Sequence, residues 1–199
     1  PADIVLGASR RRRRSSPPAG GTLAGMSSRT RLVTPEDATV IAELQTRNRA
    51  FLAPWEPVRE DTYFTVVGQR ADITTALERH ERGESLPLVV LDRDGEVAGR
   101  LTLSGIVRGP FLSCSMGYWL SEDRTGQGLA TEAVEAAVHI AFDEMGLHRV
   151  EAGTLRSNSA SQGVLGRAGF EQYGLAPGYL KIAGRWEDHV LFQRLNPLV

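Results

Sequence analysis

The residues best suited to chemistry lie in one stretch, Trp119–Ala130, where an apolar segment turns through Gly126 and Gly128 into a predicted helix. Glycines two residues apart let the backbone approach a bulky ligand and point successive amides at it. The helix that begins near Gly128 adds the positive end of its dipole. The stretch therefore predicts an anion site suited to a pyrophosphate, and an ordinary strand-to-helix turn is the alternative.

Two common phosphate-binding motifs do not fit this turn. A Walker loop needs a lysine and a serine or threonine after its last glycine, but Leu129 follows Gly128 and Lys181 is the only lysine in the chain. A dinucleotide fingerprint needs a third glycine where Thr131 stands, and it normally follows the first strand of a domain. Neither nucleotide class explains the turn.

The composition is that of a soluble single-domain protein. The net charge of −1 argues against a folded domain that binds nucleic acid directly. Cys114 is the only cysteine, so the chain has neither an intramolecular disulfide nor a cysteine-built metal site. No apolar run reaches the roughly 18 residues of a membrane helix. We therefore expect a cytoplasmic protein with no metal and no membrane partner.

Residues 1–28 are predicted to be a disordered extension that precedes a folded domain at 29–199. The like-charge block Arg10–Arg14 and the segment 15–21, rich in serine, proline and glycine, cannot bury apolar surface. The arginines could contact RNA or the ribosome, or the segment could be a solvated or non-native extension.

The remaining sequence predicts a mixture of strands and helices. Thr34 is expected to cap a helix that has Pro35 at its first position and Asp37 three residues after the cap. Further helices are expected over 69–82, 128–145 and 157–167, and strands over 30–33, 86–91, 97–103, 111–120 and 148–155. The last strands form a hairpin that turns at Ala183-Gly184. The strand, helix and strand between 111 and 155 predict a right-handed crossover with parallel strands.

This order of elements resembles the GNAT N-acetyltransferase family. The central family motif is Gln/Arg-x-x-Gly-x-Gly/Ala, which Gly126 and Gly128 match, with Asp123 in the leading position; Asn158 and Gly169-Phe170 also match family positions. The resemblance implies an α/β (α+β) fold. We expect a central, mixed and strongly twisted sheet with splayed middle strands, flanked by about four helices.

Within the family, the sequence is similar to the Rim-type enzymes that acetylate the N-termini of ribosomal proteins. The matching segments are 48–59, Gly117-Tyr118, 169–171 and 184–191. The resemblance implies that acetyl-CoA is the co-substrate and that the N-terminal α-amine of a protein attacks it directly in a ternary complex. A ribosomal protein is the expected partner, and the chain is expected to be a monomer or a homodimer.

The resemblance also implies roles for individual residues. The Trp119 amide would stabilise the oxyanion, and Asn158 would bind the pantetheine arm. Leu165 stands where the family often has a tyrosine that protonates the thiolate, but Rim-type enzymes can instead use a serine at the position that matches Ser161. The resemblance therefore implies that Ser161 is the general acid, and a first-turn residue of the helix that satisfies a backbone amide is the alternative. The expected cofactor-binding residues are Tyr118, Trp119, Leu120, Arg124, Thr125, Gly126, Gln127, Gly128, Leu129, Ala130, Asn158 and Ser161.

No general base is evident, since Ser115 stands where a relative has a glutamate. An α-amine is roughly 15% neutral at pH 7, whereas a lysine is only about 0.04% neutral. An α-amine acceptor is therefore easier to reconcile with a weak base, such as water relayed to Glu56 or Asp188. The expected acceptor-site residues are Trp55, Glu56, Tyr179 and Trp186, and His189 is expected to be structural.

Two other functions stay open at this point. The acceptor could be a small amine, such as an antibiotic, a polyamine or an amino acid. The chain could also be a non-catalytic assembly factor that binds CoA or the ribosome.

Overall fold

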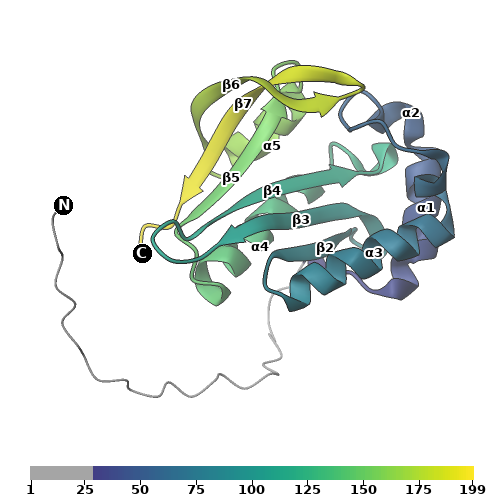
Figure 1. The fold of residues 1–199 in the computed structure, drawn as a ribbon, viewed down its shortest axis with the longest axis horizontal. Helices are drawn as coiled ribbons and strands as arrows, with labels where there is room; N and C mark the ends of the chain where they lie inside the picture. Colours follow the sequence, from purple (N-terminus) through teal and green to yellow (C-terminus); the bar gives the residue numbers. More distant parts are fainter. Residues whose placement is uncertain (1–28) are drawn as a thin grey trace, which may run out of the picture.

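The computed structural model describes residues 29–199, which form a seven-stranded sheet with helices on both faces (Figure 1). The sheet order is β1-β2-β3-β4-β5-β7-β6. The predicted extension at 1–28 lies outside the described residues. The strands are β1 Thr30–Leu32, β2 Ser85–Leu91, β3 Val97–Val107, β4 Ser113–Leu120, β5 Arg149–Leu155, β6 Glu171–Ile182 and β7 Arg185–Leu195. The α-helices are α1 Ala38–Arg47, α2 Arg49–Leu52, α3 Val66–Glu81, α4 Leu129–His139 and α5 Ser159–Arg167.

Local sequence signals explain where most elements begin and end. The predicted helix start at Thr34 is a 3-10 turn, Pro35–Asp37, that leads into α1, and the Thr34 amide donates to Asp37 Oδ2 at 2.8 Å as in a capping box. Helix α3 begins at Val66, three residues before the predicted start, because the Thr65 side chain accepts the Gly68 amide at 3.0 Å and caps it. The predicted helix over 128–145 is α4 followed by a π-helical turn, Ile140–Glu144. The β6–β7 hairpin turns at Ala183-Gly184, as predicted.

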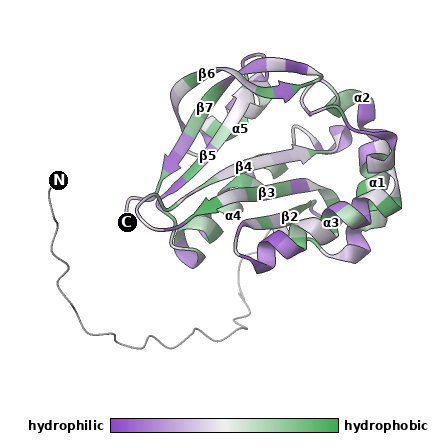
Figure 2. Cartoon of the chain, viewed as in Figure 1, coloured by the Kyte–Doolittle hydropathy of each residue, from purple (hydrophilic) through white to green (hydrophobic). Residues whose placement is uncertain are grey.

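Two apolar clusters lie on opposite faces of the sheet. Leu88 and Val90 of β2 pack in the larger cluster with α4 and α5, whereas Val89 packs in the smaller cluster with α1 and α3. This alternation along β2 follows from the two-residue period of a strand. In Figure 2 green stretches lie on β3 and β4 is paler, while α1 and α3 alternate between apolar and polar stretches. The sheet is therefore covered on both sides.

The middle of the sheet splits, as expected for the family. β4 and β5 are parallel, which confirms the predicted crossover, but they pair only from Ser113–Arg149 to Ser115–Glu151. Beyond that point β4 continues to pair with β3, and β5 with β7. Segments 116–120 and 152–155 therefore turn unpaired backbone edges toward each other. Such edges can bond an extended ligand.

The strand that forms one wall of this split depends on Gly99 of β3. A Cβ atom at Gly99 would clash with the Trp119 carbonyl oxygen and lie 2.9 Å from Leu120 Cα. We expect Gly99→Ala to destabilise the fold by about 1–3 kcal/mol, because the clash is with backbone that cannot rotate away. Chemical denaturation measures the change.

Gly117→Ala is the matched control, because a Cβ atom there meets nothing within 4 Å. Removing a strand glycine without a clash should leave the free energy of unfolding unchanged or raise it by about 0.5–1 kcal/mol. Equal stability of the two variants would contradict the prediction.

Candidate active site

A cavity of about 810 Å³ opens where β4 and β5 part. The unpaired ends of the two strands form two of its walls, and the turn after β4 and helix α5 form two more. The α2 region and the β6–β7 hairpin close the remaining side, and Figure 1 shows the hairpin reaching across toward α2. The glycine turn, the strand end and Ser161, which the sequence analysis selected separately, therefore line one cavity.

The glycine turn supplies amides that lie outside the backbone bonds of the described residues. Gly126 and Gly128 have φ of +72° and +85°, a region that favours glycine. The Arg124 and Thr125 amides close the turn by donating to the Ser121 and Glu122 carbonyls. Within residues 29–199, no backbone bond outside regular helix or strand pairing uses the amides from 126 to 130. At the N-terminus of α4, these donors fit a pyrophosphate.

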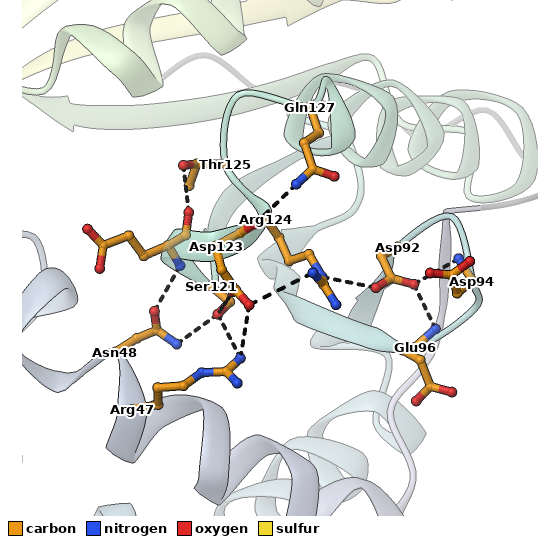
Figure 3. A network of polar contacts seen from close by, with 11 residues as sticks. Arg47, Asn48, Asp92, Asp94, Glu96, Ser121, Asp123, Arg124, Thr125 and Gln127 are labelled. Carbon is orange, nitrogen blue, oxygen red and sulfur yellow. Dashed lines mark hydrogen bonds and ion pairs between the residues drawn. The ribbon is translucent and has the colours of Figure 1, made fainter.

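The Arg124 side chain is held in place by acidic residues on both sides (Figure 3). Its Nε lies 3.0 Å from Asp92 Oδ2, and Asp92 is fixed by the Asp94 and Glu96 amides at 3.0 Å each. Asp123, at the leading motif position, lies 3.8 Å from Arg124 and 3.5 Å from Arg47. A hydrogen bond from the Ser121 hydroxyl lowers the pKa of Asp123. Asp123 is a hydrogen-bond acceptor where the family motif has Gln or Arg. Its carboxylate therefore holds the Arg47 and Arg124 side chains beside the turn and donates no hydrogen bond to a ligand.

Buried Asn48 joins the helices of the α2 side to the glycine turn (Figure 3). Its Nδ2 donates to Leu44 O at 2.8 Å and to Ser121 Oγ at 2.9 Å. Its Oδ1 accepts the Glu122 amide at 2.8 Å. These bonds link segments more than 70 residues apart in the sequence, so Asn48 fixes the turn relative to α1 and α2.

The start of α5 brings Asn158 and Ser161 to the cavity. Asn158 Oδ1 accepts the Ser161 amide at 3.0 Å and caps the helix. Only the NH₂ group of Asn158 is then left for a bond to pantetheine. Ser161 Oγ lies 2.9 Å from the hydroxyl oxygen of Tyr118 on the opposite wall. Burial raises the pKa of Tyr118 to about 12, so this phenol stays protonated at neutral pH.

A carboxylate lines the opposite end of the cavity. Glu56 lies there beside Trp55, and its carbonyl oxygen accepts the Ala183 amide of the hairpin turn at 2.9 Å. Burial raises the pKa of Glu56, while the charges of Arg59 and Arg100 oppose the shift. Glu56 is the only carboxylate among the described residues that line the cavity.

Three of the residues selected from the sequence lie outside the cavity lining. Gln127 donates to the Asp123 carbonyl at 3.1 Å, within the turn itself. The Tyr179 ring lies 5.5 Å from the ring of His189, and Trp186 is 68% exposed. The other selected residues line the cavity: Trp55, Glu56, Tyr118, Trp119, Leu120, Arg124, Thr125, Gly126, Gly128, Leu129, Ala130, Asn158 and Ser161.

Several residues that line the cavity are not expected from the sequence. They include Gly117, Thr154, Arg167 and Leu180, together with His189, which was expected to be purely structural. The only available signal was their position in predicted elements near the glycine turn, because the point where β4 and β5 part is set by tertiary packing. Within residues 29–199, no group of three or more His, Cys, Asp or Glu residues could hold a metal ion. No helix in this range is long and apolar enough to cross a bilayer.

Comparisons with known proteins agree with this geometry. Residues 29–171 match the model of the Acetyltransferase (GNAT) domain. The chain is 39% identical over 176 residues to the probable N-acetyltransferase YjcK of Bacillus subtilis, covering 86% of this chain and 97% of the relative. It is 37% identical to the ribosomal protein uS5-alanine N-acetyltransferase of Escherichia coli, covering 84% of this chain and 87% of the relative.

A solved structure of Mycobacterium smegmatis RimJ in complex with CoA-disulfide has the same fold. It superposes with a TM-score of 0.82 at 31% identity, covering 85% of this chain and 82% of the other. The predicted mixed sheet with flanking helices is therefore confirmed.

The role of Asn48 can be tested by Asn48→Asp. The variant keeps the acceptor for the Glu122 amide and loses both donated bonds. A buried group left without its partner costs about 1–3 kcal/mol, so we expect acetyl-CoA to bind about 10-fold more weakly by titration calorimetry. Asn48→Ala separates this effect from the added charge.

Asn196→Asp is the matched control. Asn196 is also buried and donates to Leu147 O at 3.3 Å, but it does not line the cavity. It should lower stability and leave the Kd for acetyl-CoA unchanged. Wild-type affinity in both Asn48 variants would show that Asn48 does not hold the turn.

Proposed function

The chain belongs to the GNAT acetyltransferase family and is an acetyl-CoA-dependent N-acetyltransferase, and we propose that its acceptor is the N-terminal α-amine of a ribosomal protein. The observation that carries the proposal is the single cavity-lining carboxylate of the described residues, Glu56. A carboxylate is a weak base, so it suits an amine that is already partly neutral at pH 7. An α-amine meets this requirement and a lysine does not. The Escherichia coli relative, named for uS5, supports a ribosomal protein as the acceptor.

Two groups of residues would hold the co-substrate, which supplies the activated acetyl group when bound. The amides from 126 to 130 and the Arg124 guanidinium would bind the pyrophosphate. The unpaired edge Tyr118–Leu120 and the Asn158 NH₂ group would bind the pantetheine arm. A strand amide near Trp119 would donate to the developing oxyanion, where a fixed donor is worth more than water. The Trp119 amide itself faces β3, because Trp119 is paired with Arg100 and the Ser121 amide two residues on donates to Ala98 O, so the donor would be the Tyr118 or Leu120 amide.

Glu56 would receive the acceptor amine. Its carboxylate would attract the α-ammonium group into the cavity and take up the proton that the nitrogen must lose, directly or through one water. Because the pKa of Glu56 is raised, it lies closer to the pKa of an α-amine, and proton transfer from the amine to Glu56 is easier. Asp188, the alternative considered from the sequence, binds the Gly178 amide at 2.9 Å and is not among the described residues that line the cavity.

Ser161 would act on the leaving sulfur from the opposite side. It lies on α5 one turn before Leu165, which is fully buried in the core and has no proton to give. If the acceptor amine attacks the acetyl group from one side while the leaving sulfur is protonated on the other, the transfer needs no covalent enzyme intermediate. A direct transfer within a ternary complex is the mechanism that this arrangement favours.

A panel of acceptors tests the proposed function. The panel contains an uS5 N-terminal peptide with a free α-amine, the same peptide with its terminus blocked and a lysine inside, and small amines such as polyamines. We expect thiol release from acetyl-CoA only with the free α-amine, and mass spectrometry should place the acetyl group there. Turnover confined to small amines would overturn the protein acceptor and keep the acetyltransferase.

Glu56→Gln should lower kcat/KM for the peptide by about 10²- to 10³-fold, the range of a general base. The variant should also be more stable at pH 7. Burial raises the pKa of Glu56 in the folded state, so the ionised form is disfavoured by folding above that pKa, and this penalty disappears as the pH falls through it. The stability gain should therefore shrink toward acidic pH in thermal unfolding scans.

Glu60→Gln is the control for both effects, since Glu60 is exposed and outside the cavity. It should change neither kcat/KM nor the pH dependence of stability. Full activity of Glu56→Gln would remove Glu56 from the mechanism.

A further inference from the structure

Two hydroxyl groups from opposite walls meet inside the cavity. Tyr118 is on β4 and Ser161 is on α5, and their oxygens are 2.9 Å apart. The Tyr118 hydroxyl also lies 3.3 Å from the Ser161 carbonyl oxygen. The Tyr118 ring packs against the larger apolar cluster, so the phenol is held in this position. This is the only contact with Ser161 Oγ among the hydrogen bonds within residues 29–199.

Ser161 is a poor proton donor by itself. An aliphatic hydroxyl is a far weaker acid than a thiol, so a serine that protonates a thiolate would be left as an unstable alkoxide. A phenol is much closer to a thiol in acidity than an aliphatic hydroxyl is, even where burial raises the pKa of the phenol to about 12, as at Tyr118. A serine that hydrogen-bonds to a phenol can pass a proton on without holding the negative charge.

We propose that Tyr118 is the source of the proton that Ser161 delivers to the departing sulfur. The inference rests on the proposed position of Ser161 beside the thioester. As the carbon–sulfur bond breaks, Ser161 gives its hydroxyl proton to the sulfur and takes the proton of Tyr118, which becomes a phenolate. The proton lost by the acceptor nitrogen goes to Glu56 and then to solvent, and solvent restores the proton of Tyr118. Charges and protons balance over one turnover.

The surroundings of Tyr118 partly offset the cost of removing its proton. Burial raises the pKa of Tyr118 to about 12, and the hydrogen bond to Ser161 and the charge of Arg167 act in the opposite direction. Arg167 also lines the cavity, so its charge would stabilise the phenolate that forms when Tyr118 gives up its proton.

Tyr118→Phe tests the proposal, because it removes the hydroxyl and keeps the ring. Hydroxylamine serves as one acceptor, since it is small and neutral above pH 7 and needs neither Glu56 nor peptide binding. The uS5 peptide serves as the other. We expect kcat to fall about 10²-fold with both acceptors, while the Kd for acetyl-CoA stays unchanged.

The pH profile distinguishes proton supply from a structural role. With hydroxylamine, wild-type kcat should be flat between pH 7 and 10, because Tyr118 stays protonated throughout. In Tyr118→Phe it should decline with pH, since solvent and buffer acids must then protonate the sulfur. Ser161→Ala should show the same decline, and the double variant should be no slower than either single variant, because the two residues act as one unit. Should Tyr118→Phe fail to fold, a proton inventory of wild-type kcat with hydroxylamine in mixtures of H₂O and D₂O carries the test, since the relay requires two protons to move together and a single moving proton would overturn it.

Tyr173→Phe is the matched control. The Tyr173 hydroxyl donates to Glu151 at 2.8 Å and its pKa is also raised to about 12, but it does not line the cavity. It should behave as wild type. A Tyr118→Phe enzyme with wild-type kcat and a flat profile would overturn the relay. If the enzyme does not acetylate the uS5 peptide but gives the expected results with hydroxylamine, only the proposed acceptor is overturned.

Discussion

The site depends on the point at which two parallel strands stop pairing. A parallel pair such as β4 and β5 would ordinarily bond along its whole length and leave no room between the strands. Here pairing ends at Ser115–Glu151, and each strand is then held by its outer neighbour alone. The split exposes two backbone edges in the middle of the domain and creates the cavity. Because buried amides and carbonyls require partners, the same feature that interrupts the sheet prepares it for an extended ligand.

A buried polar network keeps the glycine turn in place beside this split. Two features could make the turn mobile: glycines at positive φ and a short 3-10 segment, Glu122–Arg124. Asn48 holds the turn from the α1 side, and Arg124 is held between Asp92 and Asp123 (Figure 3). Asn48 and Asp92 are nearly fully buried and bonded, and satisfied networks of this kind are rigid. The amides that face the cavity are thus pre-oriented for an anion.

Whether a structural feature can be predicted from the sequence depends on how far apart along the chain the residues that form it lie. The helix start at Thr34, the hairpin turn at Ala183-Gly184 and the turn before α4 follow from residues within a few positions of each other, and the structure contains all three. The split itself followed only from the family resemblance. The contact between Tyr118 and Ser161 spans 43 residues, and no local pattern in either segment indicates it. The aromatic rings of Tyr179 and Trp186 suit an acceptor cleft, but both residues lie on a ribbon whose outer surface faces solvent.

The charged groups that line the cavity lie on different segments, and in the proposed reaction they would receive different substrates. Arg124 and the amides from 126 to 130 belong to the glycine turn, and Arg167 lies 3.4 Å from Thr131 of α4, whereas Glu56 is the lone carboxylate among the described lining residues. An anionic co-substrate would bind at the turn and a cationic amine at Glu56, so that their reactive groups would meet beside Tyr118 and Ser161. Burial makes Glu56 costly to ionise, and the charges of Arg59 and Arg100 only partly offset this cost, so the carboxyl pKa is raised toward that of an α-amine. The same desolvation that weakens the fold at Glu56 therefore improves its match to the proposed acceptor.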